Sequence, residues 1–173
     1  MMKLLRNTTI RFRLFALTLL LCLFTAAASF VGYQRLVAAE RDMTDMFRSG
    51  VLPVQWLNDS RSNMNYIRAN LFEMMLTTDE TEKRNLLAEI ENRRKLNDAN
   101  FDNYRKIELE EFEIKRLGEA DKHLAEFRKA TDEVISLALQ NKNQEAFAAF
   151  RQKAEKPMTD FRDAQRDLAD YCI

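Results

Sequence analysis

The sequence predicts an all-α protein: an N-terminal transmembrane helix followed by an antiparallel, up-down-up-down four-helix bundle. Only three glycines and two prolines occur in 173 residues, which leaves little material for the tight turns of a multi-stranded sheet. Good helix formers such as Ala, Leu, Glu, Lys and Arg dominate the composition. Apolar residues recur with helical periodicity in four successive blocks, which indicates four amphipathic helices.

The first element is an uncharged apolar run from Leu14 to Val31. About 18 apolar residues are near the minimum length for a helix that crosses a bilayer. Four basic residues precede the run: Lys3, Arg6, Arg11 and Arg13. The first acidic residue is Glu40. Because basic residues hold one flank of a membrane helix in the cytoplasm, we expect a cytoplasmic segment at residues 1–13, a transmembrane helix at 14–33 and an exported domain at 34–173.

A cleavable signal peptide is the alternative interpretation of this run. The small residues from Ala26 to Ser29 resemble a cleavage site, and cleavage after Ala28 would release a soluble exported domain. The apolar character continues through Phe30 and Val31, which favours a retained anchor. Both interpretations place the rest of the chain outside the cytoplasm.

Charge is unevenly distributed along the chain. Four of the 27 basic residues precede the apolar run and none of the 27 acidic residues does, which leaves 23 basic against 27 acidic residues and a formal charge of −4 for the rest. Phosphate backbones are bound by an excess of positive charge, so we expect no nucleic-acid partner.

The first two bundle helices have clear apolar stripes. The first stripe contains Leu57, Met64, Ile67, Leu71 and Met74, with Ser60 as its polar member. Gly50 and Pro53 predict a kink before it, because proline removes a backbone hydrogen bond and clashes with the preceding turn. Asp79, followed by Glu82, predicts the N-cap of the second helix. The second stripe contains Leu87, Ile90, Phe101 and Tyr104, interrupted by Arg94 and Asn97.

The last two helices continue this pattern. The third stripe contains Leu117, Ala120, Leu124, Phe127, Thr131, Val134 and Ala138, and a turn is expected at 141–143. The fourth predicted stripe is a heptad across eight positions: Phe147, Phe150, Ala154, Pro157, Phe161, Ala164, Leu168 and Tyr171. Four helices of about 28 to 35 residues with short connections fit a four-helix bundle. A period near 3.5 implies a left-handed twist.

No motif for catalysis, metal binding or cofactor binding stands out. His123 is the single histidine, whereas zinc sites usually take several His or Cys ligands. Glu119 and His123 are four apart, not the three of a di-iron Glu-x-x-His pair, and no haem attachment motif or phosphate-binding loop occurs. Cys22 lies in the apolar run and Cys172 near the end, so they form no disulfide framework. We expect no catalytic residue, metal or cofactor.

Polar residues beside the first stripe are the candidate binding residues. Arg61 and Arg68 are seven apart and therefore project from the same edge of the helix, with Asn65 between them. Two guanidinium groups on one edge can bind a carboxylate. The alternative is that they pair with acidic residues on a neighbouring helix or a partner chain. Arg94, Asn97 and Thr131 are further polar residues on apolar stripes, where they either fix the register of the bundle or serve a ligand.

The order of these features resembles the N-terminal sensory part of bacterial methyl-accepting chemotaxis receptors, with its four-helix-bundle ligand-binding domain. After the basic-flanked membrane helix, the matching stretches are LPVQWLNDSRSNMNYIRANLFEMMLTTD from Leu52 to Asp79 and LAEFRKATDEVISLALQNKNQEAFAAF from Leu124 to Phe150. The chain is also similar to the sensors of some histidine kinases and cyclic-dinucleotide enzymes.

The resemblance implies a homodimer packed around its first bundle helices, anchored in the bacterial inner membrane with the bundle in the periplasm. It implies a small anionic ligand, such as an organic acid or amino acid, bound directly or through a periplasmic binding protein. Arg61 and Arg68 match the ligand-binding role, but they are more widely spaced than in aspartate-sensing relatives, which leaves the ligand class open. Asn65, between them, is the third candidate binding residue. A family member would continue into a second membrane helix and a signalling domain, so we expect a truncated form.

The sequence therefore supports a chemoreceptor sensor as the main hypothesis. The alternatives are the sensor of a histidine kinase or diguanylate cyclase, and a membrane-tethered helical adaptor that binds another protein.

Overall fold

The computed structural model describes residues 10–172, and every regular element among them is helical. The chain divides into two units, one ending at Met46 and the other beginning at Phe47. The described part of the first unit is α1 (Ile10–Met46). None of its residues is buried, and all its large apolar side chains except the half-buried Val37 are exposed. By length and composition alone, the helical stretch that begins at Ile10 is the one candidate membrane span among residues 10–172.

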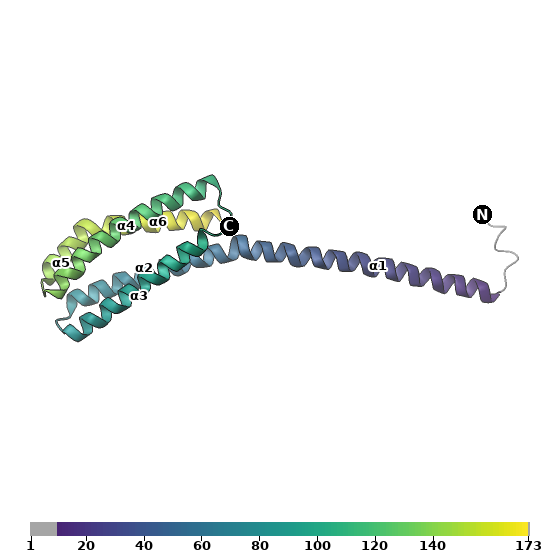
Figure 1. Cartoon of the computed structure of the whole chain (residues 1–173), viewed down its shortest axis with the longest axis horizontal. Coiled ribbons are helices and arrows are strands. Elements are labelled where there is room, and N and C mark those ends of the chain that lie inside the picture. Colours follow the sequence, from purple (N-terminus) through teal and green to yellow (C-terminus); the bar gives the residue numbers. More distant parts are fainter. Residues whose placement is uncertain (1–9, 173) are drawn as a thin grey trace. The chain divides into compact units, whose positions relative to one another are not determined.

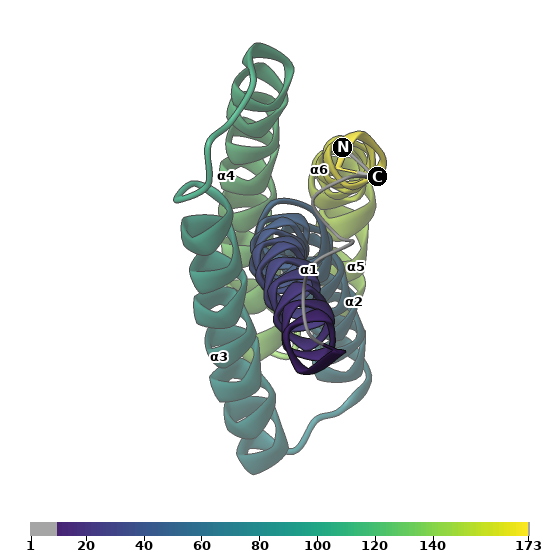
Figure 2. The same cartoon turned by 90° about the vertical axis from the view of Figure 1, so that its right-hand side faces the viewer.

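The second unit is a four-helix bundle (Figures 1 and 2). Its helices are α2 (Leu52–Leu76), α3 (Glu80–Tyr104), α4 (Glu111–Leu139), and a fourth helix composed of α5 (Asn143–Ala149), the π-helical turn η2 (Phe150–Ala154) and α6 (Glu155–Tyr171). The all-α bundle predicted from the stripes is confirmed. α2 and α3 have 25 residues each, fewer than predicted. One reason is that the chain from 105 to 110 is a loop, so α4 begins only at Glu111.

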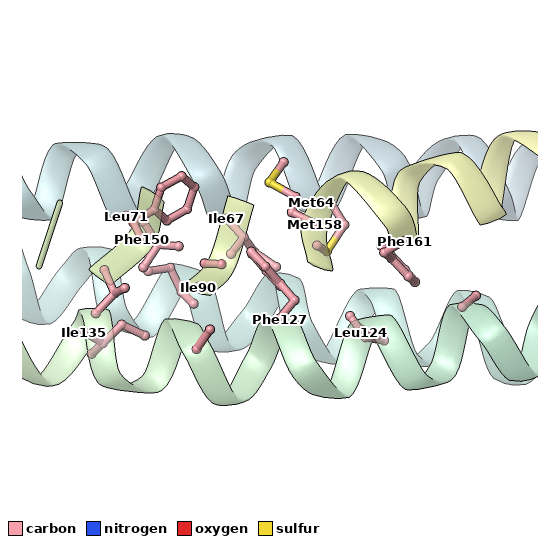
Figure 3. Close-up of a cluster of buried hydrophobic side chains, with 14 of the residues drawn as sticks. Met64, Ile67, Leu71, Ile90, Leu124, Phe127, Ile135, Phe150, Met158 and Phe161 are labelled. Atoms are coloured by element: carbon pink, nitrogen blue, oxygen red, sulfur yellow. The ribbon is translucent and has the colours of Figure 1, made fainter. Parts of the chain in front are cut away.

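The helices pack as two hairpins. α2 packs most closely against α3, and α4 most closely against α5, η2 and α6 (Figure 1). Apolar side chains from all four helices meet in one core, part of which is drawn in Figure 3. The labelled core residues are Met64, Ile67, Leu71, Ile90, Leu124, Phe127, Ile135, Phe150, Met158 and Phe161. Burial of such aliphatic and aromatic surface is the main driving force for the fold.

One predicted cap and one predicted turn are present at the ends of helices. The Asp79 carboxylate accepts hydrogen bonds from the backbone N–H groups of Thr81, at 2.7 Å, and Glu82, at 3.1 Å, which confirms the predicted N-cap of α3. The predicted turn after α4 is also present. Asn141 adopts a left-handed backbone conformation there, with φ of 61°, and asparagine tolerates this conformation better than most residues.

Both prolines lie just after a π-helical turn. Pro53 follows η1 (Phe47–Val51), and Pro157 follows η2. In a regular α-helix each proline would clash with the carbonyl group four residues earlier. Those carbonyl groups belong to Ser49 and Lys153, which both lie inside the π-helical turns. The irregularity predicted near Gly50 and Pro53 is therefore present as a wide helical turn.

The fourth helix differs from its predicted heptad at both ends and at Pro157, which is half-buried while the neighbouring Met158 lies in the core. Phe147 is 49% exposed and Tyr171 is 45% exposed, whereas Ala146 and Ala149 face the core. The turn η2 takes up one extra residue, so the apolar face of α5 is shifted by one position relative to an uninterrupted helix. A periodicity count cannot detect this shift, because it assumes a constant 3.6 residues per turn.

Candidate functional site

The candidate binding residues lie together along one edge of α2. Arg61, Asn65 and Arg68 are all exposed. No hydrogen bond or ion pair joins their side chains to any of residues 10–172. The arginines are two helical turns apart, which is about 10 Å along the axis at 1.5 Å per residue.

The missing ion pairs distinguish α2 from α3 and α4, although Arg162 of α6 also has no acidic partner among residues 10–172. Every arginine of α3 and α4 has an acidic partner: Arg84, Arg93, Arg94, Arg116 and Arg128. Neither arginine of α2 has one within the described chain. Pairing with a neighbouring helix of the same chain, which the sequence left open, is therefore absent here.

Arg61 lies beside a small cavity between α2 and α6. The cavity has a volume of about 130 Å³. Besides Arg61 and Gln165, its lining residues are Val54, Leu57, Asn58, Arg166, Ala169 and Asp170. Arg166 is engaged by Asp163, at 3.4 Å, and by Asp167, at 3.9 Å, which leaves Arg61 as the cation of this cavity without an acidic partner.

Arg68 lies beside a different and larger hollow. Its guanidinium carbon is 5.5 Å from the centroid of the Phe72 ring, a distance suited to a cation–π contact. Phe72 lines a hollow of about 430 Å³ between the end of α2 and the start of α5. Its other lining residues are Met75, Leu76, Asn143, Gln144 and Phe147. Arg61 therefore lines one cavity, whereas Arg68, on the same edge of α2, contacts a residue that lines another.

A buried polar layer connects three helices. Ser60 of α2 donates a hydrogen bond to Asn97 Oδ1 of α3 and accepts one from Gln165 Nε2 of α6 at 2.6 Å. All three side chains are buried. The sequence identified Ser60 and Asn97 as polar members of their stripes, but not Gln165, which stands beside the predicted core residue Ala164 without a sequence signal of its own.

The other polar stripe residues pair across α3 and α4. Arg94 donates hydrogen bonds to Thr131 Oγ1 and Asp132 Oδ1, each at 2.8 Å. On the opposite side of α3, Arg93 donates to Asn63 Oδ1 of α2 at 3.3 Å and stacks on Tyr66. These contacts favour the register-fixing interpretation of Arg94 and Thr131 over a ligand-binding one.

A second buried cluster lies where α3 ends and α4 begins. The Tyr104 hydroxyl donates to Glu113 Oε1 at 2.6 Å and lies 3.5 Å from Cys172 Sγ. Burial, reinforced by the hydrogen bond to the Glu113 carboxylate, raises the pKa of Tyr104. Burial likewise raises the pKa of the Cys172 thiol. Both groups are therefore held in their neutral forms, which suits a structural contact.

His123 lies near two carboxylate groups, at distances longer than a typical hydrogen bond. Its Nδ1 lies 3.4 Å from Glu126 Oε2 and 4.0 Å from Asp160 Oδ2. Among residues 10–172, no group of three or more His, Cys, Asp or Glu side chains is arranged to hold a metal ion.

Comparison with known families identifies the module. The family model described as "Four helix bundle sensory module for signal transduction" matches residues 7–173. No curated protein and no solved structure matches the chain significantly. Because the match spans nearly the whole chain and the structure has the corresponding four helices, the chain belongs to the family of four-helix-bundle sensory modules found in methyl-accepting chemotaxis proteins.

Proposed function

We propose that the chain is the ligand-sensing part of a bacterial chemoreceptor, and that it binds a small anion, such as an organic acid or amino acid, along the Arg61–Asn65–Arg68 edge of α2. The observation that carries the proposal is that both α2 arginines lack an acidic partner, whereas every arginine of α3 and α4 has one. An exposed, unpaired guanidinium group is available to bind a carboxylate in two-point geometry.

The proposed mechanism is a biased equilibrium between two packings of the bundle. The Ser60–Asn97–Gln165 layer joins α2, α3 and α6, so a ligand that shifts α2 would also act on α6. A ligand changes the populations only as far as it binds one packing more tightly than the other. No enzymatic step is part of this proposal.

The proposed location is the bacterial inner membrane, with the N-terminus in the cytoplasm and the bundle in the periplasm. The basic residues before the apolar run and the exposed apolar surface of α1 support it. Alkaline phosphatase fused after Ile173 should be active in cells, because this enzyme folds only after export. An inactive phosphatase fusion, together with a fluorescent fusion protein in the cytoplasm at the same site, would contradict the topology.

The proposed assembly is a homodimer packed around α2, with the ligand received directly or from a periplasmic binding protein. With both native cysteines replaced by serine, the exposed Ser62→Cys of α2 should form a disulfide-linked dimer in membranes. Lys95→Cys, exposed on α3, is the matched control and should remain monomeric.

Binding to the full chain in lipid nanodiscs tests the sensing function. Isothermal titration with succinate, citrate, aspartate and phenylacetate should reveal at least one saturable ligand. A ligand held by Arg61 should bind about tenfold more weakly to Arg61→Ala, and one held by Arg68 about tenfold more weakly to Arg68→Ala, the usual loss for a hydrogen bond to a charged group. Asn65→Ala should weaken the binding less, because the Asn65 amide is neutral and forms no ion pair with the carboxylate. Arg162→Ala removes an exposed charge from α6 and should have no effect.

The alternative functions predict other results. A protein-binding adaptor predicts no saturable small ligand and no effect of Arg61→Ala or Arg68→Ala on small-molecule binding. A histidine-kinase or diguanylate-cyclase sensor predicts the same binding as the chemoreceptor, and differs only in the output domain to which the module is joined.

A further inference from the structure

We propose that the hollow beside Arg68 binds a small aromatic carboxylate, with its ring against Phe72 and Phe147 and its carboxylate at the Arg68 guanidinium group. This inference rests on the proposed sensing function and specifies the class of ligand. We call this site the α2–α5 hollow, defined by the lining residues Phe72, Met75, Leu76, Asn143, Gln144 and Phe147.

The α2–α5 hollow has the size and lining of a small-molecule site. Its volume of about 430 Å³ lies within the range of ligand pockets. Four of its six lining residues are apolar, and none is charged. Leu76 is 85% exposed at this end of the bundle, and Phe147 is 49% exposed. An apolar hollow with two polar side chains in its lining, Asn143 and Gln144, has the composition typical of small-molecule sites.

Two phenylalanine rings make the hollow suitable for an aromatic ligand. The centroid of Phe72 lies 6.3 Å from that of Phe147 and 4.9 Å from that of Phe150, with tilted and edge-on geometries. Phe150 is buried, so it holds Phe72 in place as a fixed wall. Phe147 is the outer ring. A ligand ring can therefore pack in the offset or edge-to-face arrangements that aromatic groups prefer.

The charge of the ligand follows from Arg68. Arg68 does not line the hollow, but its guanidinium carbon lies 5.5 Å from the centroid of the Phe72 ring, which does, so Arg68 is a cation next to an uncharged lining. Its guanidinium group has no acidic partner among residues 10–172. One cation next to an uncharged, ring-lined hollow complements a ligand with one carboxylate and one apolar ring.

The discriminating experiment compares probes that carry the ring, the charge or both. The full chain in lipid nanodiscs is titrated with phenylacetate, with its neutral amide phenylacetamide, and with acetate and succinate, which lack the ring. Phenylacetate should bind saturably, and the other three probes about tenfold more weakly or worse, because each lacks the charge or the ring contact.

Variants then locate the site. Phe147→Ala should weaken phenylacetate binding at least about threefold, the effect of losing one aromatic pair. Phe112→Ala is the matched control, because it removes a similarly exposed ring at the other end of the bundle and should leave binding unchanged. Leu76→Glu introduces a negative charge at a highly exposed position, where the fold tolerates it, and should abolish binding of the carboxylate. Circular dichroism checks the fold of each variant.

The remaining outcomes overturn the inference in distinguishable ways. If succinate or an amino acid binds in an Arg68-dependent manner and phenylacetate does not, the aromatic class is wrong while the sensing function stands. If phenylacetate binds equally well to Phe147→Ala, the site lies elsewhere. If Phe147→Ala changes the sedimentation coefficient instead of ligand binding, the hollow is an interface between copies of the chain. If no organic anion binds, the proposed function fails as well.

Discussion

Lys83 is the most deeply buried charged residue of the bundle. It is 1% exposed, and its ammonium group donates hydrogen bonds to the Ala138 carbonyl and, at 2.7 Å, to Asn141 Oδ1. These acceptors lie at the end of α4, where the last carbonyl groups lack partners within the helix and the helix dipole favours a cation. Lys83 therefore ties the start of α3 to the end of α4 without an acidic partner.

Replacing Lys83 by methionine keeps the length of the side chain and removes the ammonium group. We expect Lys83→Met to lower the free energy of unfolding by about 1.5–3 kcal/mol, the range for hydrogen bonds to charged groups. Urea unfolding followed by circular dichroism measures this. Lys95→Met on the exposed side of α3 should change stability by less than about 0.5 kcal/mol. Equal stability of the two variants would mean that the cost of burying the charge cancels its hydrogen bonds.

The Ser60 hydroxyl holds two buried amide groups in place. Asn97 Nδ2 and Gln165 Oε1 have no hydrogen-bond partner within the described chain. The two hydrogen bonds among Ser60, Asn97 and Gln165 therefore both involve the Ser60 hydroxyl. A partly satisfied buried polar layer costs stability and is kept where it specifies one arrangement.

Ser60→Ala should lower the free energy of unfolding by about 1–3 kcal/mol, because both amides lose their partner in a dry environment. The triple variant Ser60→Ala, Asn97→Leu, Gln165→Leu should recover the loss, since no polar atom of the layer remains unpaired. Ser62→Ala, exposed on the same helix, is the control. A triple variant less stable than Ser60→Ala alone would show that packing, not pairing, governs the layer.

At the scale of the element, the fourth helix shows what periodicity can and cannot predict. The sequence correctly identified the helix and the buried positions Phe150, Ala154, Phe161, Ala164 and Leu168. It misplaced the start, because the π-helical turn η2 shifts α5 by one residue and turns Ala146 inward in place of Phe147. Pro157 indicates that the helix is irregular nearby, but a proline does not predict which irregular geometry the helix adopts.

The candidate site likewise has features that the sequence predicts and features that it does not. Helical spacing, which is local, predicts that Arg61, Asn65 and Arg68 share an edge. The α2–α5 hollow depends on how α5 packs beside the end of α2, which is a long-range contact. Lys83 and Gln165 likewise find their partners 55 and 105 positions away along the sequence. Such long-range contacts cannot be inferred from the spacing of residues along a single sequence.

We infer that the small side chains of α5 determine the position of the π-helical turn η2. Pro157 is then accommodated by the wider turn that precedes it. Ala146 and Ala149 pack against the core, and a phenyl ring in place of Ala146 would not fit a fully buried position. Pro157→Ala should therefore keep the turn. It should raise the free energy of unfolding by about 1–3 kcal/mol, because alanine restores a backbone donor and is much the better helix former. Denaturant unfolding measures the gain. A loss of stability, with Phe147 becoming buried, would show that the proline itself causes the turn.

At the scale of the whole molecule, the two units differ in how much of their apolar surface is buried. α1 buries none of its side chains and exposes the uncharged apolar run from Leu14 to Val31, whereas its last part, from Arg35 onward, carries charged residues. The bundle from Phe47 onward has its own continuous core, its own helix caps and a predominantly charged exterior. A unit with a complete core can fold independently.

Residues 47–173 alone should therefore form a soluble, cooperatively folded bundle. Removing α1 deletes no buried side chain, so we expect one thermal transition, with a Tm within about 4 °C of the full chain, equivalent to less than about 1 kcal/mol. Differential scanning calorimetry of the soluble bundle and of the full chain in detergent makes the comparison. As a reference for core loss, Phe161→Ala should lower the stability of both forms by about 3–5 kcal/mol. A broad, non-cooperative transition in the bundle alone would mean that residues 47–173 do not fold independently of α1.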